Sequence, residues 1–533
     1  MNFQLFLFAF LFSITGFTQT SDDGHEYLNH PADIQSYNVQ IVLKEETDEI
    51  SVSEMIRFVL SEPCDSFFID LQSDNGKTGM ILESAAFDYS WAEYNHRNNR
   101  IWIKTKNQPV NTPLSLVLKY HGVPETGLII GENKFQDRTY FGDNWPNRAH
   151  HWFACVDHPS DKATINFTVT VPKGFECIAT GTLYKKDVSF EKFDRFEYRS
   201  DIQLPTKVMV IGVANFDEKE YFTELPFPVT SWSYLQDAAN GFNDMSVSVK
   251  VVSYFIDLIG EYPFEKLANV QSTTQFGGME NAGNIFYDEK AITGERTMEA
   301  LIAHEIAHQW FGNSASELDW QHIWLSEGFA TYFTDLYWED TYGTDKMNER
   351  LLGERNRVVG FSKKYLHPVV DTSYASLMNL LNPNSYQKGA WVLHMLRNEV
   401  GDSAFFKGIQ TYYHEYQFGN STTEDLKKII EDQAGHNLDV FFDQWLYKAG
   451  HPVLNFRRGV KKGGWEYLTI RQEQENVVFN FDLQIEVFYQ KGQSEIFTIS
   501  VDEREEKFEF PTKKEIESIK FDPNTRLLFE EVE

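Results

Sequence analysis

The sequence has few cysteines, an excess of acidic over basic residues, and one long apolar run, at its beginning. Three cysteines, Cys64, Cys155 and Cys177, are too few to form a disulfide framework. One bridge stays open as an alternative, with Cys155–Cys177 as the nearer pair in sequence. None of the three has the spacing of a metal-ligand motif.

Basic residues are outnumbered, with 48 Lys and Arg against 79 Asp and Glu and a formal net charge of −31. So acidic a chain is a poor partner for nucleic acid or for an anionic membrane. We therefore expect no nucleic-acid partner and no stable membrane insertion. The charge itself favours solubility, and it would favour cationic substrates only if it were concentrated near a site.

Residues 1–19 contain an apolar run, Leu5 to Phe12, followed by Ser, Thr and Gly. The run is too short to span a bilayer and is typical of a signal peptide cleaved near residues 16–19. We therefore predict an exported protein, periplasmic or extracellular. Because Met1 to Gln4 contain no Lys or Arg, a retained N-terminal membrane tether stays as the alternative.

The 533 residues predict several domains, and 42% hydrophobic residues allow sizeable cores. Apolar and polar residues alternate at 37–43 and 56–60, which predicts a hairpin, and similar runs recur at 114–120 and 164–171. Helical periodicity follows at 242–259, 296–312, 325–341, 386–400 and 422–433, the last with a capping-box pattern from Ser421 to Glu424. Alternation returns at 479–489 and 496–501, which predicts a small β-sandwich.

The strongest chemical signal is His304-Glu305-Ile306-Ala307-His308, in a predicted helix from Thr297 to Phe311 that Gly312 and Asn313 would close. Positions i and i+4 share one face of a helix, so His304 and His308 can hold one ion together. Imidazole suits Zn²⁺, and a catalytic zinc site takes three protein ligands. Glu305 can act as general base. A chance match to this pattern is the alternative.

A third ligand is expected from the next predicted helix, where Glu327 follows His308 after 18 intervening residues. A second helix packed beside the first can bring this carboxylate to the ion. Alternatively, Glu327 is an ordinary glutamate in a first helical turn, where the helix dipole favours it. Its apolar neighbours Leu325 and Phe329 favour the buried ligand.

With these motifs the chain resembles the M1 aminopeptidases, a branch of the gluzincins. HExxH, 18 residues and a glutamate in Trp324-Leu325-Ser326-Glu327-Gly328-Phe329-Ala330 match the zinc motif, and Gly277-Gly278-Met279-Glu280-Asn281 is similar to the exopeptidase motif. The segment 386–390 resembles the catalytic-tyrosine segment. Residues 145–149, 157–159, 441–446 and 450–452 extend the resemblance over essentially the whole mature chain.

The resemblance implies a multidomain α+β fold. Its parts would be an N-terminal β saddle domain (20–215), a thermolysin-like α/β zinc catalytic domain (216–451) and a C-terminal β-sandwich (452–533), after the signal peptide (1–19). The large C-terminal helical domain of many members is expected to be absent, which would leave the site more open to longer peptides.

The resemblance also implies the chemistry. A single zinc ion held by His304, His308 and Glu327 would activate water, Glu305 would be the general base, and the Tyr386 hydroxyl would stabilise the oxyanion. Glu280 would recognise the free α-ammonium of a peptide substrate, and the loop of Gly277, Gly278, Met279 and Asn281 would admit the substrate backbone.

Two positions depart from the family pattern. A second amine-binding Glu or Gln is usual a few residues before the arginine that matches Arg148, and Asp143 stands there, or Asn144 in a shifted register. Ser326 replaces the usual Asn before the ligand glutamate. Gln275 and Met279 either line the pocket for the first residue or pack internally.

Three other functions stay open. A thermolysin-like endopeptidase would use the same zinc motif but would not need Glu280, and it would cut N-terminally blocked peptides. An epoxide-hydrolase-like relative is neither supported nor excluded by any residue. A non-catalytic peptide-binding protein would be expected to lack Glu305, a zinc ligand or Tyr386, and all of these are present. The oligomeric state is not predicted.

Overall fold

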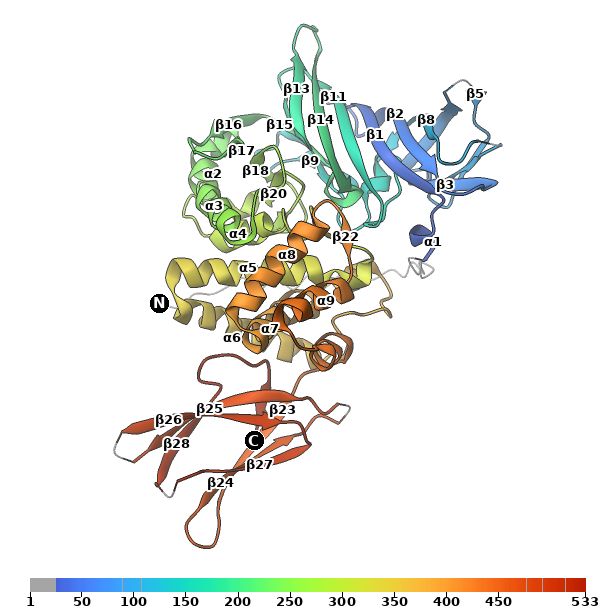
Figure 1. Ribbon diagram of the computed structural model, residues 1–533. Coiled ribbons are helices and arrows are strands. Elements are labelled where there is room, and N and C mark those ends of the chain that lie inside the picture. Colours follow the sequence, from blue (N-terminus) through green and yellow to red (C-terminus); the bar gives the residue numbers. More distant parts are fainter. Residues whose placement is uncertain (1–24, 89, 107, 476, 491, 513) are drawn as a thin grey trace.

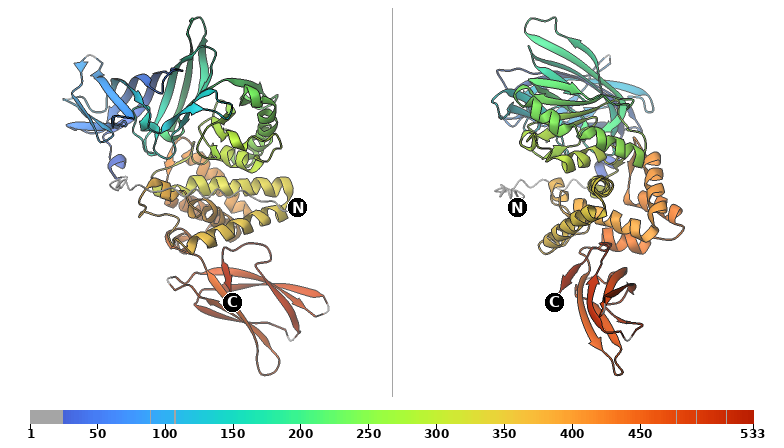
Figure 2. Two further views of the ribbon diagram at one scale, coloured as in Figure 1. Left: turned by 180° about the vertical axis from the view of Figure 1, so that it is seen from behind. Right: turned by 90° about the vertical axis from the view of Figure 1, so that its left-hand side faces the viewer.

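The computed structural model describes residues 25–533 except 89, 107, 476, 491 and 513. The predicted signal peptide, residues 1–19, lies outside this part of the chain. The fold is multidomain α+β: a β-rich N-terminal part, a middle layer of helices and a C-terminal β part follow one another along the long axis (Figure 1). Both views of Figure 2 show the same order.

The N-terminal part is built on an eight-stranded sheet in the order β13-β14-β11-β1-β2-β8-β4-β5. Its strands are β1 (Ala32–Val42), β2 (Ile50–Leu60), β4 (Gly79–Phe87), β5 (Ser90–Trp91), β8 (Pro113–Val123), β11 (Lys162–Pro172), β13 (Thr182–Asp187) and β14 (Phe193–Pro205). A short helix, α1 (His25–Leu28), precedes them. The predicted hairpin is confirmed, because β1 pairs antiparallel with β2.

Two smaller sheets complete this part. One has the order β3-β7-β6 and the other the order β12-β15-β10-β9. Their strands are β3 (Ser66–Asp70), β6 (Tyr94–Arg97), β7 (Arg100–Lys104), β9 (Gly127–Glu132), β10 (Arg138–Asp143), β12 (Glu176–Ala179) and β15 (Ile211–Ala214).

A five-stranded sheet with the order β16-β17-β18-β20-β19 follows. Its strands are β16 (Phe216–Glu220), β17 (Val229–Tyr234), β18 (Leu267–Ser272), β19 (Gly278–Met279) and β20 (Asn284–Asp288). Most of its strands are buried on both faces. The edge strand β19 belongs to the Gly-rich segment and pairs only with β20 in this sheet.

The α-helices after α1 are α2 (Ala238–Met245), α3 (Ser248–Ile259), α4 (Glu299–Ala307), α5 (Trp324–Tyr342), α6 (Thr344–Ser362), α7 (Gly389–Val400), α8 (Asp402–Tyr416), α9 (Thr423–Ala434) and α10 (Asp439–Phe442). Helices α2 and α3 lie beside the five-stranded sheet, and α5 to α9 belong to the middle layer (Figure 1). Two short strands, β21 (Ser316–Glu317) and β22 (Asn420–Ser421), pair between them. Helix α5 is buried along most of its length and packs against α4, α6 and α7. Glu327, which belongs to α5, is therefore held in the interior of the protein.

The C-terminal part consists of two sheets, β27-β24-β23-β29 and β26-β25-β28. Their strands are β23 (Val453–Val460), β24 (Glu466–Gln472), β25 (Phe481–Tyr489), β26 (Gln493–Val501), β27 (Glu505–Glu509), β28 (Ile516–Phe521) and β29 (Glu530–Val532). The ring of Phe456 on β23 stacks on that of Phe521 on β28, with centroids 3.7 Å apart. The two sheets therefore face each other.

Three sequence predictions of helices need correction. The segment 242–259 is two helices, α2 and α3, divided at 246–247. The helix predicted to reach Phe311 ends at Ala307, because the amides of Gln309 and Trp310 bond three residues back, a tighter pattern that breaks the α-helical ladder. The capping box lies one residue later than predicted: Thr422 and Asp425 cap each other at the start of α9.

A second, smaller core links the sheet that contains β10 to the five-stranded sheet and reaches the site. Phe141 on β10 contacts Phe286 on β20 edge to face at 5.4 Å. The same cluster contains Trp145 and Met279. It therefore ties a loop of the N-terminal part to the Gly-rich segment, and both loops belong to one packed unit.

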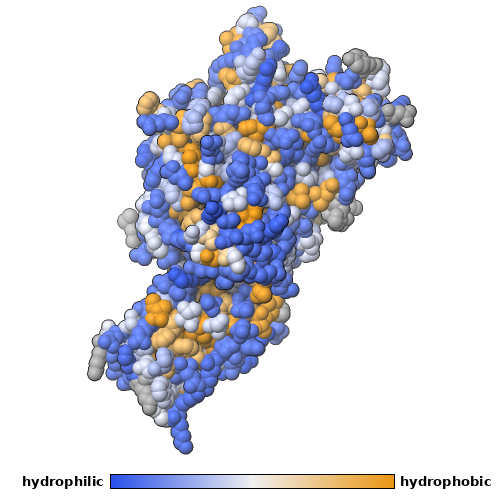
Figure 3. Space-filling view, in the orientation of Figure 1, coloured by the Kyte–Doolittle hydropathy of each residue, from blue (hydrophilic) through white to orange (hydrophobic). Residues whose placement is uncertain are grey.

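The cysteines Cys64, Cys155 and Cys177 are all free, so the bridge left open by the sequence is not formed. The face in Figure 3 is largely hydrophilic, with apolar residues in scattered patches. Among the described residues, no helix is both long and apolar enough to cross a membrane.

Candidate metal centre and substrate pocket

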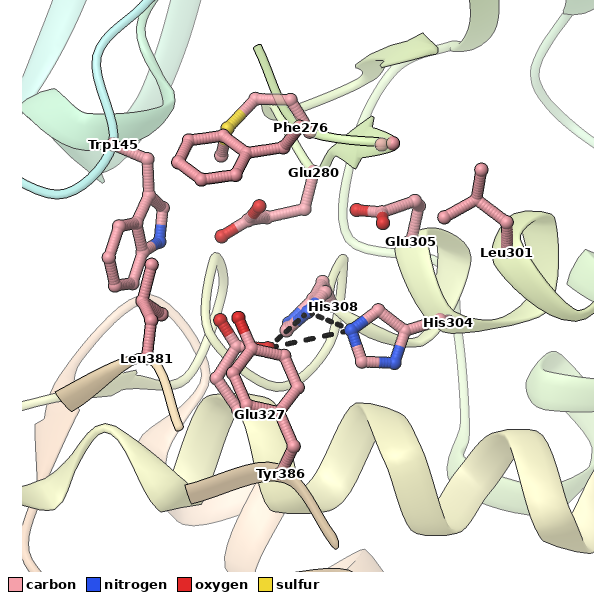
Figure 4. A pocket seen from close by; sticks show the side chains of 13 residues that line it. Trp145, Phe276, Glu280, Leu301, His304, Glu305, His308, Glu327, Leu381 and Tyr386 are labelled. Atoms are coloured by element: carbon pink, nitrogen blue, oxygen red, sulfur yellow. Dashed lines mark hydrogen bonds and ion pairs between the residues drawn. The ribbon is translucent and has the colours of Figure 1, made fainter. Parts of the chain in front are cut away.

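Three side chains from two packed helices converge on one point. His304 lies in the last turn of α4, His308 follows directly as its C-cap residue, and Glu327 lies in the first turn of α5. The two Nε2 atoms are 3.1 Å apart, and Glu327 Oε2 lies 3.5 Å from His304 Nε2 and 3.3 Å from His308 Nε2 (Figure 4). The three predicted zinc ligands are thus brought together.

Local contacts determine which nitrogen of His308 faces this point. Its Nδ1 lies 3.2 Å from the carbonyl oxygen of Phe311, and because a carbonyl can only accept, Nδ1 carries the proton. Ser326 Oγ also contacts this nitrogen, at 3.1 Å. Ser326, which departs from the family pattern, therefore contacts the imidazole at the nitrogen that faces away from the cluster, and Nε2 is left as the ligand atom.

The donor set fits a divalent cation. His308 and Glu327 are almost completely buried, His304 is largely buried, and Glu327 Oε2 has no hydrogen-bond partner. Three acceptor atoms that face one another inside a protein need a cation between them, and two imidazoles with one carboxylate suit zinc.

The pKa values show the same need for positive charge. Burial lowers the pKa of His308, but Glu327 and Glu280 together raise it to about 9. Burial would raise the pKa of Glu327, yet His308 and His304 hold it well below its usual range. Without another cation, a proton on His308 balances the carboxylates.

Glu280, Glu305 and His308 form a second group with donor atoms within 4.8 Å of one another. It cannot be filled independently of the first, because His308 has only Nε2 free and the first group uses that atom. The two groups therefore cannot each bind an ion through His308. Two carboxylates, Glu280 and Glu305, are left beside it.

Glu305 points into the pocket from α4 and is 4% exposed. Burial, with Glu280 and Glu327 nearby, raises its pKa well above the usual value for a glutamate. A Cβ at Gly278 would lie 2.4 Å from Glu305 Oε1, so any larger residue at this position of β19 would displace the Glu305 carboxylate. Gly277 has no such constraint, because its nearest neighbour would be Leu301 at 3.9 Å.

Glu280 directly follows the edge strand β19 and is also 4% exposed. Its backbone carbonyl accepts hydrogen bonds from Gln309 Nε2 at 2.8 Å and from Asn313 Nδ2 at 2.7 Å, so the turns after the HExxH helix hold it in place. Its Oε1 has no hydrogen-bond partner. Burial is the main cause that raises its pKa.

Tyr386 lies in a π-helical turn, Asn384–Lys388, that precedes α7. Its ring stacks on that of His304, with centroids 6.0 Å apart, and its hydroxyl points into the pocket (Figure 4). Burial and the charge of Glu327 raise its pKa well above 10, so the hydroxyl stays protonated and can donate a hydrogen bond.

These groups line one pocket of about 220 Å³. Of the residues predicted from sequence, it is lined by Gly277, Gly278, Met279, Glu280, His304, Glu305, His308, Glu327 and Tyr386. Sequence reasoning did not assign a pocket role to the four other lining residues, Trp145, Phe276, Leu301 and Leu381. Local pattern carried no signal for them, because they come from four separate segments.

Three predicted site residues lie outside this lining. The buried carboxylate of Asp143 accepts hydrogen bonds from Thr274 Oγ1 at 3.2 Å and the Gln275 amide at 3.0 Å, and it pairs with Arg148. Gln275 itself is exposed and accepts a hydrogen bond from Arg148 at 3.2 Å. Asn281 is completely buried in the turn after Glu280.

Asn144, the alternative in the shifted register, is structural. Its amide nitrogen donates to the carbonyls of Thr206 and Met209, and its oxygen accepts from the indole of Trp152. Asp143 instead fastens the loop that leads into β19. Asp143 therefore supports a loop next to the pocket and does not itself line the pocket.

This cluster of two histidines and a glutamate is a ligand set typical of zinc metallopeptidases. Residues 244–445 of this chain match the family model of the peptidase family M1 domain. The sequence resemblance is thereby confirmed.

Two aminopeptidases from other organisms are similar in sequence to part of this chain. Glutamyl aminopeptidase of Sus scrofa is 28% identical over 329 residues, which is 59% of this chain and 35% of the relative. Probable aminopeptidase 2 of Sulfurisphaera tokodaii is 28% identical over 404 residues, 70% of this chain and 50% of the relative. The chain thus spans between about a third and a half of the length of these relatives.

The crystal structure of Legionella pneumophila aminopeptidase A in complex with aspartic acid has a similar fold, with a TM-score of 0.81 and 15% sequence identity. The likeness covers 95% of this chain and 60% of that chain.

Proposed function

We propose that the protein is a zinc aminopeptidase that removes the N-terminal residue of peptides. The observation that carries the proposal is Glu280: its buried carboxylate has an unpartnered oxygen, and its backbone carbonyl is held beside the metal centre by Gln309 and Asn313. Such an oxygen needs a donor, and the α-ammonium of a peptide is the cation guaranteed to lie next to the first peptide bond. An endopeptidase has no use for this group.

His304, His308 and Glu327 would hold the zinc ion. When bound, zinc polarises the scissile carbonyl and makes a water molecule more acidic. Glu305, whose pKa is raised by burial, takes the proton of the attacking water and later gives it to the leaving amine. The protonated hydroxyl of Tyr386 donates to the developing oxyanion.

The substrate backbone has a place to lie. β19 is an edge strand that pairs with β20 on one side only, and Gly278 at its start, with Gly277 just before it, leaves room for a peptide to pass close to the loop. A peptide added in this way would place its N-terminus at Glu280 and its first carbonyl near Glu305.

We further propose the domain organisation and location predicted from sequence. Residues 216–451 would form a thermolysin-like catalytic domain between an N-terminal β saddle domain (20–215) and a C-terminal β-sandwich (452–533). The segment 1–19 would direct export to the periplasm or the extracellular space.

The test uses aminoacyl-coumarin amides with free and with N-acetylated amino groups, with and without a zinc chelator. We expect cleavage of the free-amine set alone, loss of activity with chelator, and recovery with added zinc. Glu305→Gln and Tyr386→Phe should each lower kcat by about 10²-fold or more. Cleavage of the acetylated set would instead identify an endopeptidase.

The names of two of the similar proteins raise a specific question about substrate. They call one relative a glutamyl aminopeptidase and describe the similar fold in complex with aspartic acid. An acidic first residue is therefore the specificity that the comparisons suggest for this chain, and the charges around its pocket are the physical test of it.

A further inference from the structure

Glu280 is surrounded by apolar side chains on the side away from the catalytic base. In Figure 4, Trp145, Phe276 and Leu381 lie around its carboxylate, and Glu305 with Leu301 lies on the opposite side. A substrate whose ammonium meets Glu280 and whose scissile bond lies near Glu305 would therefore direct its first side chain toward these three residues. They form the wall of the pocket for the first side chain.

Trp145 is a fixed part of this wall. It is 3% exposed and packs edge to face against Trp320, with centroids 6.1 Å apart. The Nζ atom of Lys207 lies 6.0 Å from its ring. Because Trp145 also belongs to the second hydrophobic core, its ring is already fixed in position before a substrate side chain binds.

Two basic side chains that lie against lining residues are already paired with carboxylates. Lys207 forms an ion pair with Glu317, and both side chains are at most 1% exposed. Arg148 pairs with the completely buried Asp143 and stacks on Phe276, with 5.7 Å between its guanidinium carbon and the ring centroid. Among the described residues that line the pocket, the only basic side chains are the two histidines of the metal centre.

An acidic first side chain would meet carboxylates instead of a cation. Glu280, Glu305 and Glu327 all line the pocket, and a further buried carboxylate would be repelled and left unpaired. A cationic side chain fares little better, because these three carboxylates already serve the ammonium, the proton transfer and the metal. Apolar side chains lose water at no such cost.

We propose that the pocket formed by Trp145, Phe276 and Leu381 selects peptides whose first residue is a large apolar or aromatic one, such as Leu, Met or Phe. The proposal rests on the proposed aminopeptidase function. It departs from the acidic specificity suggested by the names of the similar proteins.

The experiment compares coumarin amides of Leu, Met, Phe, Ala, Glu and Lys with the full-length zinc-loaded protein. We expect kcat/KM for Leu, Met or Phe to exceed that for Ala by roughly 10- to 100-fold, and that for Glu by more. Glu cleaved as well as Leu would overturn the proposal and leave the aminopeptidase function intact. Cleavage of none of the six would contradict the function itself.

Two variants test the wall. Trp145→Ala should lower kcat/KM for Phe and Leu by roughly 10-fold or more and change that for Ala less. Trp91→Ala, which removes a tryptophan 78% exposed on β5, is the matched control and should change none of these values. Leu381→Arg alters a half-buried loop residue and should raise the Glu-to-Leu ratio, a readout that does not depend on the folding of Trp145→Ala. The assignment of this wall would be overturned if Trp145→Ala left kcat/KM for Phe and Leu unchanged relative to Ala and Leu381→Arg left the Glu-to-Leu ratio unchanged.

Discussion

Replacing Glu280 by Gln tests the feature that separates an aminopeptidase from an endopeptidase. The substitution keeps the shape of the side chain and removes its charge. Glu280 is 4% exposed and its Oε1 has no partner, so a substrate ammonium would form a desolvated ion pair there. Removing one partner of such a pair costs about 3–5 kcal/mol.

At about 1.4 kcal/mol per factor of ten, this cost corresponds to a loss of about 10²- to 4 × 10³-fold in kcat/KM for free-amine substrates. The assay is the hydrolysis of a leucine coumarin amide and of its N-acetyl derivative, together with the zinc content of each variant. The ratio between the two substrates should collapse in Glu280→Gln. Zinc content should stay the same, because Glu280 is not one of the three proposed ligands.

A matched control is Glu415→Gln, an exposed glutamate on α8, which should change nothing. The reasoning is refuted if Glu280→Gln loses less than about tenfold on the free-amine substrate. It is equally refuted if the variant loses its zinc, because Glu280 would then act through the metal centre and not through the amine.

The remaining predictions concern buried charges. Burial raises the pKa of Glu54 from 4.5 to about 8, so the folded chain keeps a proton that the unfolded chain releases above pH 4.5. Its contribution to stability should fall by about 1.4 kcal/mol per pH unit between pH 5 and 8, and thermal melts of Glu54→Gln should show a flatter pH dependence; equal slopes would contradict this. Lys207→Met leaves Glu317 buried and uncompensated and should destabilise the protein by about 3–5 kcal/mol, whereas adding Glu317→Leu should restore most of the melting temperature; a double variant as unstable as the single one would contradict this. Asp143→Asn removes the negative charge that pairs with Arg148. Kinetic assays should then show a higher ratio of kcat/KM for the Glu substrate to that for the Leu substrate, with unchanged zinc content. An unchanged ratio would mean that Arg148 is too far from the first side chain of the substrate to affect its binding.

Strongly patterned segments of the fold could be predicted from the sequence. Alternation of apolar and polar residues found β1 and β2, and helical periodicity found α5 and α9. Helix α6 was not predicted, although Met347, Leu351 and Val358 are buried at helical spacing. Most of its other residues are polar, so the sequence does not show which face of the helix is buried. That face is defined by the packing of α6 against α5.

Element boundaries were the least predictable feature, because they depend on tertiary contacts. The prediction that the HExxH helix continues to Phe311 followed the apolar pattern. In the structure, Gln309 and Asn313 instead turn back to bind the carbonyl of Glu280. The helix therefore ends early at the place where Glu280, the proposed amine-binding residue, is held, and this requirement comes from a segment about 30 residues earlier in the chain.

The metal cluster and the pocket wall differ in how much the sequence reveals. His304 and His308 are one helical turn apart, so local spacing alone predicts that they share an ion. Trp145, Phe276 and Leu381 are brought together only by the packing of loops from different parts of the chain. Each is individually an ordinary apolar residue, and no spacing pattern marks it as part of a pocket wall, even where, as with Phe276, it adjoins a recognised motif.

The charges in the pocket also explain why a blocked N-terminus should be rejected. Glu280, Glu305 and Glu327 supply three negative charges, and the two histidines are neutral when they bind a metal. A zinc ion contributes two positive charges and a substrate ammonium contributes the third, so the buried charges balance only when both are present. An N-acetylated peptide supplies no third positive charge, so one buried carboxylate has to take up a proton when this peptide binds, and the protonated acid forms no ion pair with the substrate. Selection for a free amine is therefore a property of the whole charge balance and not of Glu280 alone.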